Sequence, residues 1–370
     1  MVMILLSCVT GFSNSALKSR SCFRKLTSSS LASTSNVKSG SIATGDMQAM
    51  AEEEMKKLEG FYKKASFPSP TLWKSHSEAS SFVHENIDTV LFDCDGVLYR
   101  TLDICPGASK CIQALLEKGK RVLFVTNNGG INRRQLKEKL GMLLGIDSFT
   151  NDQMVSSSYA CSKYLKQHLS AGSRVHVIGS AGLCEELANN GFEISGGPSN
   201  DIPSMDRQEL ELYDFAEHPI DAIAVGHDIE FTFRKLCIAN NLLLRNSNAL
   251  FVATNEDSFD LVGSDTRHIP GNGCIVKALE YCSRRRAVNV GKPSNTLAKL
   301  IEEEHGLDPA RSLFVGDRLD TDIRFGNDNG MKSLLVMTGV TTAQTMIDLR
   351  EGTTEEPLPH FVLPHIGMLT

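Results

Sequence analysis

Two acidic residues, Asp93 and Asp95, stand one residue apart after the apolar run Thr89–Phe92 and are followed by Gly96. In an extended backbone, side chains two positions apart face the same side, so both carboxylates face one way while the strand continues. Two carboxylates this close need a cation or a shared proton, and Gly96 permits the sharp turn that follows. Taken alone, such a pair fits a functional site, a polar turn or a calcium-type loop.

Three further apolar runs also end in polar residues, and ligands of α/β proteins bind outside the carboxyl ends of strands. Each polar residue alone has a structural explanation: Thr126 as a turn cap, Lys292 as a solvated charge, Asp320 as a helix N-cap. All of them together at strand ends, in this order, favour a functional site over these separate explanations. The runs and the residues after them are Arg121–Val125 with Thr126, Asn127 and Asn128; Val288–Val290 with Lys292; and Ser312–Val315 with Asp317, Asp320 and Asp322.

The elements that must position these residues alternate along the chain. Short runs rich in β-branched residues predict strands, and the amphipathic stretches between them predict helices. This alternation predicts an α/β fold with a Rossmann-like parallel sheet and helices on both faces. The remaining predicted strands are Val175–Ile178, Ala222–Val225, Leu250–Ala253 and Ser333–Val336, and the predicted helices are Cys111–Lys118, Arg133–Leu144, Ala181–Asn190, Phe233–Leu244 and Leu297–His305.

The four ordered motifs resemble those of the haloacid dehalogenase phosphatases. The resemblance implies that Asp93 is the nucleophile, that Asp95 is the general acid and base, and that Lys292 neutralises charge between nucleophile and phosphate. It also implies a Mg²⁺ ion held by Asp93, by the backbone carbonyl of Asp95 and by Asp317. Thr126, Asn127 and Asn128 match the phosphate-binding motif, and Asp322 is expected to orient Lys292 or a metal-bound water.

The long segment between Thr126 and Lys292 has its own strand-and-helix pattern. The resemblance implies an α/β cap inserted into the core, so we expect core residues 86–170 and 288–370 and cap residues 171–287. Within the family the chain is similar to the phosphoglycolate and 4-nitrophenyl phosphatases. That similarity implies a small phosphorylated metabolite as substrate and a homodimer formed through the cap.

Two positions depart from the family pattern. Gly129, followed by Gly130, stands where the family has Ser after the paired asparagines, so a hydroxyl near the phosphate is lost, although backbone N–H groups can replace it. His227 stands between Gly226 and Asp228 where the family has an aromatic residue. A donor imidazole there would pair with a substrate carboxylate; the alternative is a satisfied, partly buried histidine.

Composition narrows the possible partners. The net charge of −6 and the pI of about 6.0 give no broad attraction for nucleic acid. No apolar run approaches the roughly 20 residues that span a bilayer, so we expect no membrane partner. The ten cysteines include no CxxC pair, which argues against a zinc site.

The first 45 residues form a region of their own. They lack acidic residues before Asp46 and contain five basic ones: Lys18, Arg20, Arg24, Lys25 and Lys38. This composition predicts a transit peptide over residues 1–45, and the apolar start Met1 to Val9 leaves room for a signal-type segment. Residues 46–85 read as a linker. Chloroplast or plastid targeting is expected, with the mitochondrion or cytoplasm as alternatives.

Together these features predict a phosphomonoesterase that hydrolyses 2-phosphoglycolate through an aspartyl-phosphate, with a role in photorespiration. The alternatives are another small ester, such as glycerol phosphate, pyridoxal phosphate, 4-nitrophenyl phosphate or a nucleotide, and a catalytically silent protein on the same fold. The silent protein is disfavoured because no core motif residue is missing.

Overall fold

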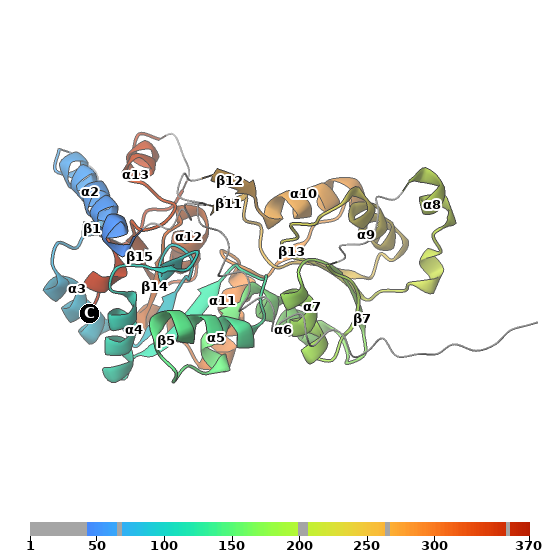
Figure 1. The fold of residues 1–370 in the computed structure, drawn as a ribbon, viewed down its shortest axis with the longest axis horizontal. Helices are drawn as coiled ribbons and strands as arrows, with labels where there is room; N and C mark the ends of the chain where they lie inside the picture. The colour runs from blue at the N-terminus through green and yellow to red at the C-terminus, as the bar shows by residue number, and fades with distance from the viewer. Residues whose placement is uncertain (1–42, 65–68, 199–205, 263–266, 353–355) are drawn as a thin grey trace, which may run out of the picture. The chain divides into compact units, whose positions relative to one another are not determined.

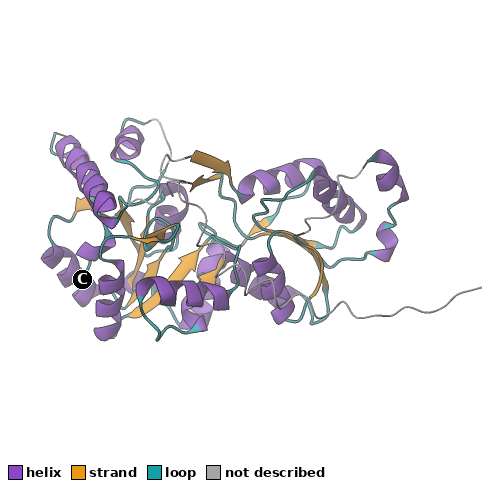
Figure 2. Ribbon diagram, viewed as in Figure 1, coloured by secondary structure: helices purple, strands orange, loops and turns teal. Residues whose placement is uncertain are grey.

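The computed structural model describes residues 43–64, 69–198, 206–262, 267–352 and 356–370 (Figure 1). The predicted transit segment therefore lies outside the described residues, apart from 43–45. Two parallel sheets with helices packed on them confirm the predicted α/β class with a parallel-sheet core (Figure 2).

The larger sheet has seven strands, and each neighbouring pair is parallel. The chain order reverses at strand β2 (Thr89–Phe92), because the next strands in sequence lie on one side of it and the last ones on the other. In such sheets, a binding crevice forms at the carboxyl ends beside the point of reversal. From edge to edge the strands are β1 (Thr71–Leu72), β16 (Phe361–Leu363), β15 (Lys332–Val336), β14 (Ser312–Gly316), β2 (Thr89–Phe92), β5 (Arg121–Thr126) and β6 (Met154–Ser156).

The side chains of β2 alternate between two cores. Val90 and Phe92 pack with the buried faces of two helices, α4 (Ala108–Glu117) and α5 (Arg133–Leu144). Leu91 points the other way and packs with α6 (Ser157–His168) and α11 (Asn295–His305). All four strand residues are buried, as expected for a central strand covered on both faces.

The smaller sheet has five parallel strands and lies between helices. One face shares the apolar cluster of Leu91 and packs on α7 (Ala181–Asn189). The other face packs on α9 (Phe233–Arg245) and α10 (Asn272–Ser283). From edge to edge the strands are β13 (Val288–Asn289), β10 (Leu250–Ala253), β9 (Ala222–Val225), β7 (Arg174–Ile178) and β8 (Glu193–Gly196).

The predicted strands are all present, with ends within one residue of the prediction, and the predicted helices are present with ends within three residues. The domain boundary differs slightly. Val288 and Asn289 pair with β10, so the smaller sheet extends past the expected end of the cap at residue 287.

Residues 46–85, expected as a linker, are part of the core. Helix α2 (Thr44–Tyr62) buries Ala51, Met55 and Leu58 in a cluster with α13 (Ala343–Arg350). Strand β1 forms the edge of the larger sheet, and Trp73 after it stacks on Phe361 with ring centroids 4.2 Å apart. Helix α3 (His76–Asn86) follows and leads into β2. The apolar residues of α2 recur at helical spacing, so the sequence pattern indicates an amphipathic helix here.

Two small hairpins flank the carboxyl end of β2. The core hairpin pairs β3 (Tyr99–Arg100) with β4 (Asp103–Ile104). The cap hairpin pairs β11 (Phe259–Val262) with β12 (Arg267–Pro270). Both are antiparallel, and neither was predicted.

Among the described residues, no helix is both long enough and apolar enough to cross a membrane.

Candidate active site

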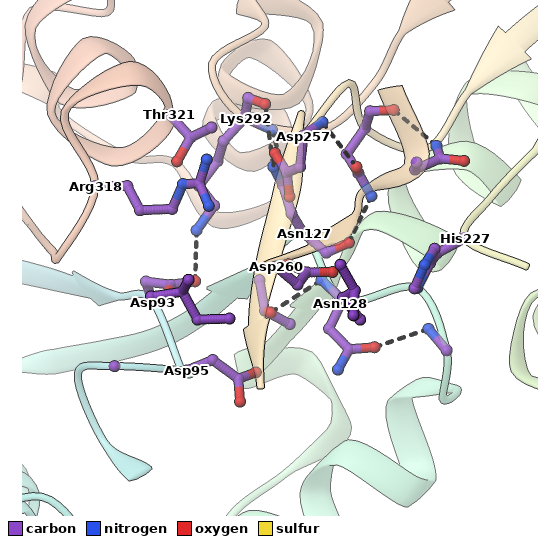
Figure 3. A pocket seen from close by; sticks show the side chains of 18 of the residues that line it. Asp93, Asp95, Asn127, Asn128, His227, Asp257, Asp260, Lys292, Arg318 and Thr321 are labelled. Atoms are coloured by element: carbon purple, nitrogen blue, oxygen red, sulfur yellow. Dashed lines mark hydrogen bonds and ion pairs between the residues drawn. The ribbon is translucent and has the colours of Figure 1, made fainter. Parts of the chain in front are cut away.

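Three neighbouring strands of the larger sheet end at the same place. Phe92 pairs with Val315 of β14 and with Phe124 of β5, and the Asp93 N–H donates to the Val315 carbonyl over 2.9 Å. The residues that follow these strands, among them Asp93 and Asn127, therefore meet where the strand order reverses (Figure 3).

Lys292 links two of the predicted acidic residues. Its Nζ lies 2.5 Å from Oδ1 of Asp93 and 2.8 Å from Oδ1 of Asp322. The other oxygen of Asp322 accepts the N–H groups of Asp317 and Arg318, over 3.0 and 3.1 Å. Burial alone would lower the pKa of Lys292, but Asp322 and Asp93 raise it. The lysine is therefore a fixed cation beside the Asp93 carboxylate.

Asp317 has one carboxylate oxygen that is satisfied and one that is not. Oδ2 accepts the N–H of Val340 over 2.7 Å. Oδ1 is buried and has no hydrogen-bond partner among the described residues. Burial, and then Asp322, raise the pKa of Asp317 to about 7. The carboxylate fills the space that a Cβ at Gly96 would need, 2.6 Å from Oδ2, and a Cβ at Gly339 would also clash with it.

These carboxylates fit a divalent cation. Asp93, Asp317 and Asp322 offer oxygens that lie within 4.8 Å of one another. Three carboxylates and the one Lys292 ammonium give a formal charge of −3 + 1 = −2. Burial raises the pKa of Asp93, Lys292 opposes the rise, and the two neighbouring carboxylates add to it. A buried excess of negative charge is costly unless a cation offsets it.

Asp93 and Asp317 are the better ligand candidates in this cluster. Both oxygens of Asp322 are already engaged by Lys292 and by backbone N–H groups. Hard divalent cations such as Mg²⁺ take carboxylate oxygens, and the unpartnered Oδ1 of Asp317 is such a donor. The predicted metal set also includes the backbone carbonyl of Asp95, and the Asp95 side chain is not part of this carboxylate cluster.

Asp95 instead faces the cavity. Its Oδ2 accepts the hydroxyl of Tyr99 over 3.2 Å, and the residue is exposed to the cavity although protein surrounds it. Burial raises the pKa of Asp95, while Lys139 and the Tyr99 hydrogen bond oppose the rise. A carboxyl group that protonates more readily than usual and follows Asp93 by two positions suits general acid–base work.

The side-chain amides of Asn127 and Asn128, which follow β5, mainly stabilise the site through hydrogen bonds. Asn127 Oδ1 accepts the N–H of Lys292 over 2.8 Å, and its Nδ2 donates to Oδ1 of Asp257 over 2.8 Å. Thr126 Oγ1 accepts the Asn128 N–H over 3.1 Å. Asn128 Oδ1 accepts the Gly130 N–H over 2.9 Å. Thr126, Asn127, Asn128 and Gly130 all line the cavity, and the Gly130 N–H is already bonded to Asn128.

Gly129 leaves room for a serine from another element. A Cβ at Gly129 would lie 3.0 Å from Oγ of Ser157, which donates to the Asn127 carbonyl over 2.7 Å. The cap also packs on this loop: Ser180 Oγ donates to the Gly130 carbonyl over 3.2 Å. A Cβ at Gly182 in α7 would clash with the backbone of Gly130. The departure from the family pattern thus coincides with a core–cap contact.

The cap covers a cavity of about 700 Å³ above these motifs. His227 follows β9 and lines the cavity, half-buried. Its neighbour Asp228 is buried and pairs with Lys235, with Oδ2 2.5 Å from Nζ. His227 therefore faces the position where the organic part of a substrate would lie (Figure 3).

The cap hairpin is tied to the core by Arg318. Nη1 of Arg318 donates to the Phe259 carbonyl over 3.0 Å, and its guanidinium lies 4.8 Å from the centre of the Phe259 ring. Asp320 binds the other side of the guanidinium through Nε at 3.1 Å and Nη2 at 2.9 Å. The hairpin and the residues before it bring Asp257 and Asp260 to the cavity, and burial raises the pKa of Asp257 to about 6.

Sequence reasoning missed Arg100, Asp257, Asp260 and Arg318. Arg318 lies inside the quoted fourth motif and Arg100 lies five residues after Asp95. Neither has a spacing that distinguishes it from a surface residue. The two aspartates reach the cavity only because the cap folds over the core.

Comparisons with known proteins agree with this geometry. Residues 90–193 match the model of the haloacid dehalogenase-like hydrolases, and residues 289–369 match a second model described as HAD-hydrolase-like. The chain is 37% identical to phosphoglycolate phosphatase 2 of Arabidopsis thaliana over 78% of this chain and 94% of the relative. The chain belongs to the haloacid dehalogenase-like hydrolases.

Other relatives within this family carry different substrate names. The chain is 39% identical to glycerol-3-phosphate phosphatase of Gallus gallus, over 72% of this chain and 85% of the relative. The crystal structure of p-nitrophenyl phosphatase from Archaeoglobus fulgidus superposes with a TM-score of 0.64 at 28% identity, covering 77% and 98% of the two chains. The protein is therefore a hydrolase of the phosphatase class.

Proposed function

We propose that the protein hydrolyses 2-phosphoglycolate to glycolate and phosphate through an aspartyl-phosphate intermediate on Asp93. The observation that carries the chemistry is the buried Asp93 carboxylate, fixed by Lys292 and beside Asp317, below a cavity that Asp95 faces. The similarity to phosphoglycolate phosphatase 2 supports the substrate.

Asp93, Asp95 and Lys292 have proposed roles that their contacts support. An oxygen of Asp93 attacks phosphorus, the bond from phosphorus to the ester oxygen breaks, and Asp95 gives its proton to the leaving alkoxide. Asp95 then takes a proton from water, which attacks phosphorus and releases phosphate with Asp93 restored. Lys292 offsets negative charge beside Asp93 throughout.

Mg²⁺ is the proposed cofactor, and Asp93 and Asp317 are the residues that would hold it. Mg²⁺ supplies charge neutralisation for the phosphoryl group when bound. Thr126 and the backbone around Asn127 and Asn128 line the part of the cavity nearest Asp93 and are proposed to hold phosphate oxygens.

Glycerol phosphate is the second candidate. The cap hairpin and the residues before it bring Asp257 and Asp260 to the cavity, and a neutral polyol is repelled by carboxylates less than an acid is. The similarity to glycerol-3-phosphate phosphatase points the same way.

One panel assay separates these candidates. Phosphate release from 2-phosphoglycolate, glycerol 3-phosphate, pyridoxal phosphate, 4-nitrophenyl phosphate and a nucleoside monophosphate is measured with Mg²⁺. We expect the highest kcat/KM for 2-phosphoglycolate. A higher kcat/KM for any other ester would replace the proposed substrate, and no release from any ester would support the catalytically silent alternative.

We also propose plastid targeting, in keeping with a role in photorespiration, because the first 45 residues have the composition of a transit peptide. Residues 1–43 fused to a fluorescent protein should enter plastids. A protein starting at Ala43 should keep full activity, whereas one starting at Lys63 loses α2 and should be unstable. Retention of the fusion in the cytoplasm or its arrival in mitochondria would overturn the proposal.

A homodimer that forms through the cap is also proposed, because the family resemblance implies it. Light scattering measures the mass of the protein in solution and tests this proposal.

A further inference from the structure

The proposed reaction leaves one substrate charge without a partner. In 2-phosphoglycolate the carboxylate carbon is two bonds from the ester oxygen, which is the atom that Asp95 protonates. The carboxylate must therefore lie close to Asp95, which is itself an acid and has Asp260 as a charged neighbour. A cation in this part of the cavity is needed to hold the substrate carboxylate.

The cavity-lining lysine and arginine residues are Arg100, Lys292 and Arg318. Lys292 is bound by Asp93 and Asp322. Arg318 is held by Asp320. Within the part of the chain that the structure describes, Arg100 alone of the three has no carboxylate within ion-pair distance. Its guanidinium is therefore available to a ligand.

The position of Arg100 also suits this role. Arg100 and Asp95 line the same cavity, and the strand that carries Arg100 also carries Tyr99, whose hydroxyl binds the Asp95 carboxylate. Two lysines act on the Asp95 carboxyl, but neither is available to a ligand. Lys292 is bound by two carboxylates, and the Nζ of Lys139 lies 3.8 Å from the centre of the Tyr99 ring and does not line the cavity.

The turn after Arg100 is strained. Thr101 has a φ of 59°, a left-handed conformation that a β-branched residue rarely adopts. Thr101 lines the cavity beside Arg100. Strain of this kind persists where the surrounding structure fixes the backbone, and it clusters at ligand sites.

We propose that Arg100 binds the carboxylate of the substrate and makes the enzyme selective for a phosphorylated acid. This inference rests on the proposed function and deepens it. Arginine offers a planar pair of N–H donors that matches a carboxylate. Acid selectivity then comes mainly from the core hairpin, with His227 contributing from the cap side.

The test compares Arg100→Gln and Arg100→Lys with the unchanged enzyme on 2-phosphoglycolate and on glycerol 3-phosphate. For Arg100→Gln the ratio of the two kcat/KM values should fall about 10- to 100-fold, because one charge-assisted contact is lost. The change should come mainly from a higher KM for 2-phosphoglycolate. Arg100→Lys should recover part of the ratio, because it keeps the charge but not the paired donors.

Arg134→Gln is the matched control, because Arg134 is an exposed arginine of α5 that pairs with Glu138 away from the cavity. It should leave the ratio unchanged. Circular dichroism establishes that each variant is folded, and Arg100→Lys provides the comparison if Arg100→Gln is not.

The two proposals fail in different ways. If the unchanged enzyme does not prefer 2-phosphoglycolate, the proposed function falls, and the role of Arg100 falls with it. If it does prefer 2-phosphoglycolate but the Arg100 variants lower both kcat/KM values equally, only the role of Arg100 is overturned.

Discussion

The core and cap faces of the cavity differ in how firmly their polar side chains are held. On the core face, Asp93, Lys292 and Asp322 are buried and bound to one another. On the cap face, the half-buried His227 makes no side-chain hydrogen bond or ion pair with another described residue. The buried groups of the core face therefore suit one fixed reaction, whereas His227 on the cap face, like Arg100 on the core hairpin, is free to meet the substrate.

The largest effect should come from the core face. Asp93→Asn removes the nucleophile but keeps the side-chain shape, so we expect the fold to remain and kcat to fall by roughly 10⁴-fold or more. Turnover of 4-nitrophenyl phosphate measures the loss. Near-normal activity in fresh protein shown by mass spectrometry to be free of deamidation would rule out Asp93 as nucleophile.

Asp317→Asn should have the next largest effect. It removes a charged ligand candidate, so Mg²⁺ activation should weaken by roughly 100-fold, which a Mg²⁺ titration of kcat/KM measures. Without metal, the variant should be more stable than the unchanged protein above pH 7. The raised pKa of Asp317 means that its contribution to stability is present below about pH 4 and is lost as pH rises through about 7.

Two outcomes would contradict this assignment. One is full activity of the unchanged enzyme in excess EDTA. The other is equal Mg²⁺ dependence in Asp317→Asn and the unchanged enzyme. Ca²⁺ should inhibit, because its larger and looser coordination shell misplaces the reacting groups.

A smaller effect is expected from the cap face. His227→Phe places the family's aromatic residue here and removes one hydrogen-bond donor, so kcat/KM for 2-phosphoglycolate should fall about 2- to 10-fold. The loss for 4-nitrophenyl phosphate, which has no carboxylate, should be smaller. Steady-state kinetics on both substrates measures this, and equal losses on both would mean that His227 is structural. A loss as large as that of Asp93→Asn would show that the cap face is as important for turnover as the core face.

The smallest effect concerns the cap's own stability. His176 is buried in β7, with Nδ1 3.1 Å from Oγ of Ser195, and burial together with His218 lowers its pKa to about 4. Its stabilising contribution is present above pH 6.5 and is lost as pH falls toward 4. Between pH 7 and pH 5 the free energy of unfolding should fall by about 1–2 kcal/mol more than in His176→Gln.

Urea unfolding at the two pH values measures this difference. His84→Gln, which changes an exposed histidine of α3, is the control and should keep the pH dependence of the unchanged protein. The same pH dependence in all three proteins would show that His176 is not the group responsible.

The sequence predicted the core face better than the cap face for a physical reason. Asp93, Thr126 and Asp317 follow strands with strong apolar patterns, and adjacent parallel strands bring their ends together without further information. Arg100 and Asp260 reach the cavity on short hairpins with no periodic signal. Their placement depends on packing between distant segments, which a local pattern does not encode.

The N-terminal helix shows a different limit. Helix α2 has an apolar stripe that was visible in the sequence, yet its charged residues and the prolines after it favoured a linker. Helix α13 is distant from α2 in the sequence, so a local pattern does not indicate that α2 is buried against it.

Strand β13 has a mechanical consequence. It is hydrogen-bonded into the smaller sheet, and Lys292 follows three residues after its last residue, Asn289. The backbone N–H of Lys292 is in turn anchored to Asn127 in the core. Lys292 thus lies on a short segment between a strand of the smaller sheet and an anchor in the core, so a displacement of the smaller sheet would shift the backbone that sets the position of Nζ beside Asp93. The position of the smaller sheet and the electrostatic environment of Asp93 are therefore linked through this short segment.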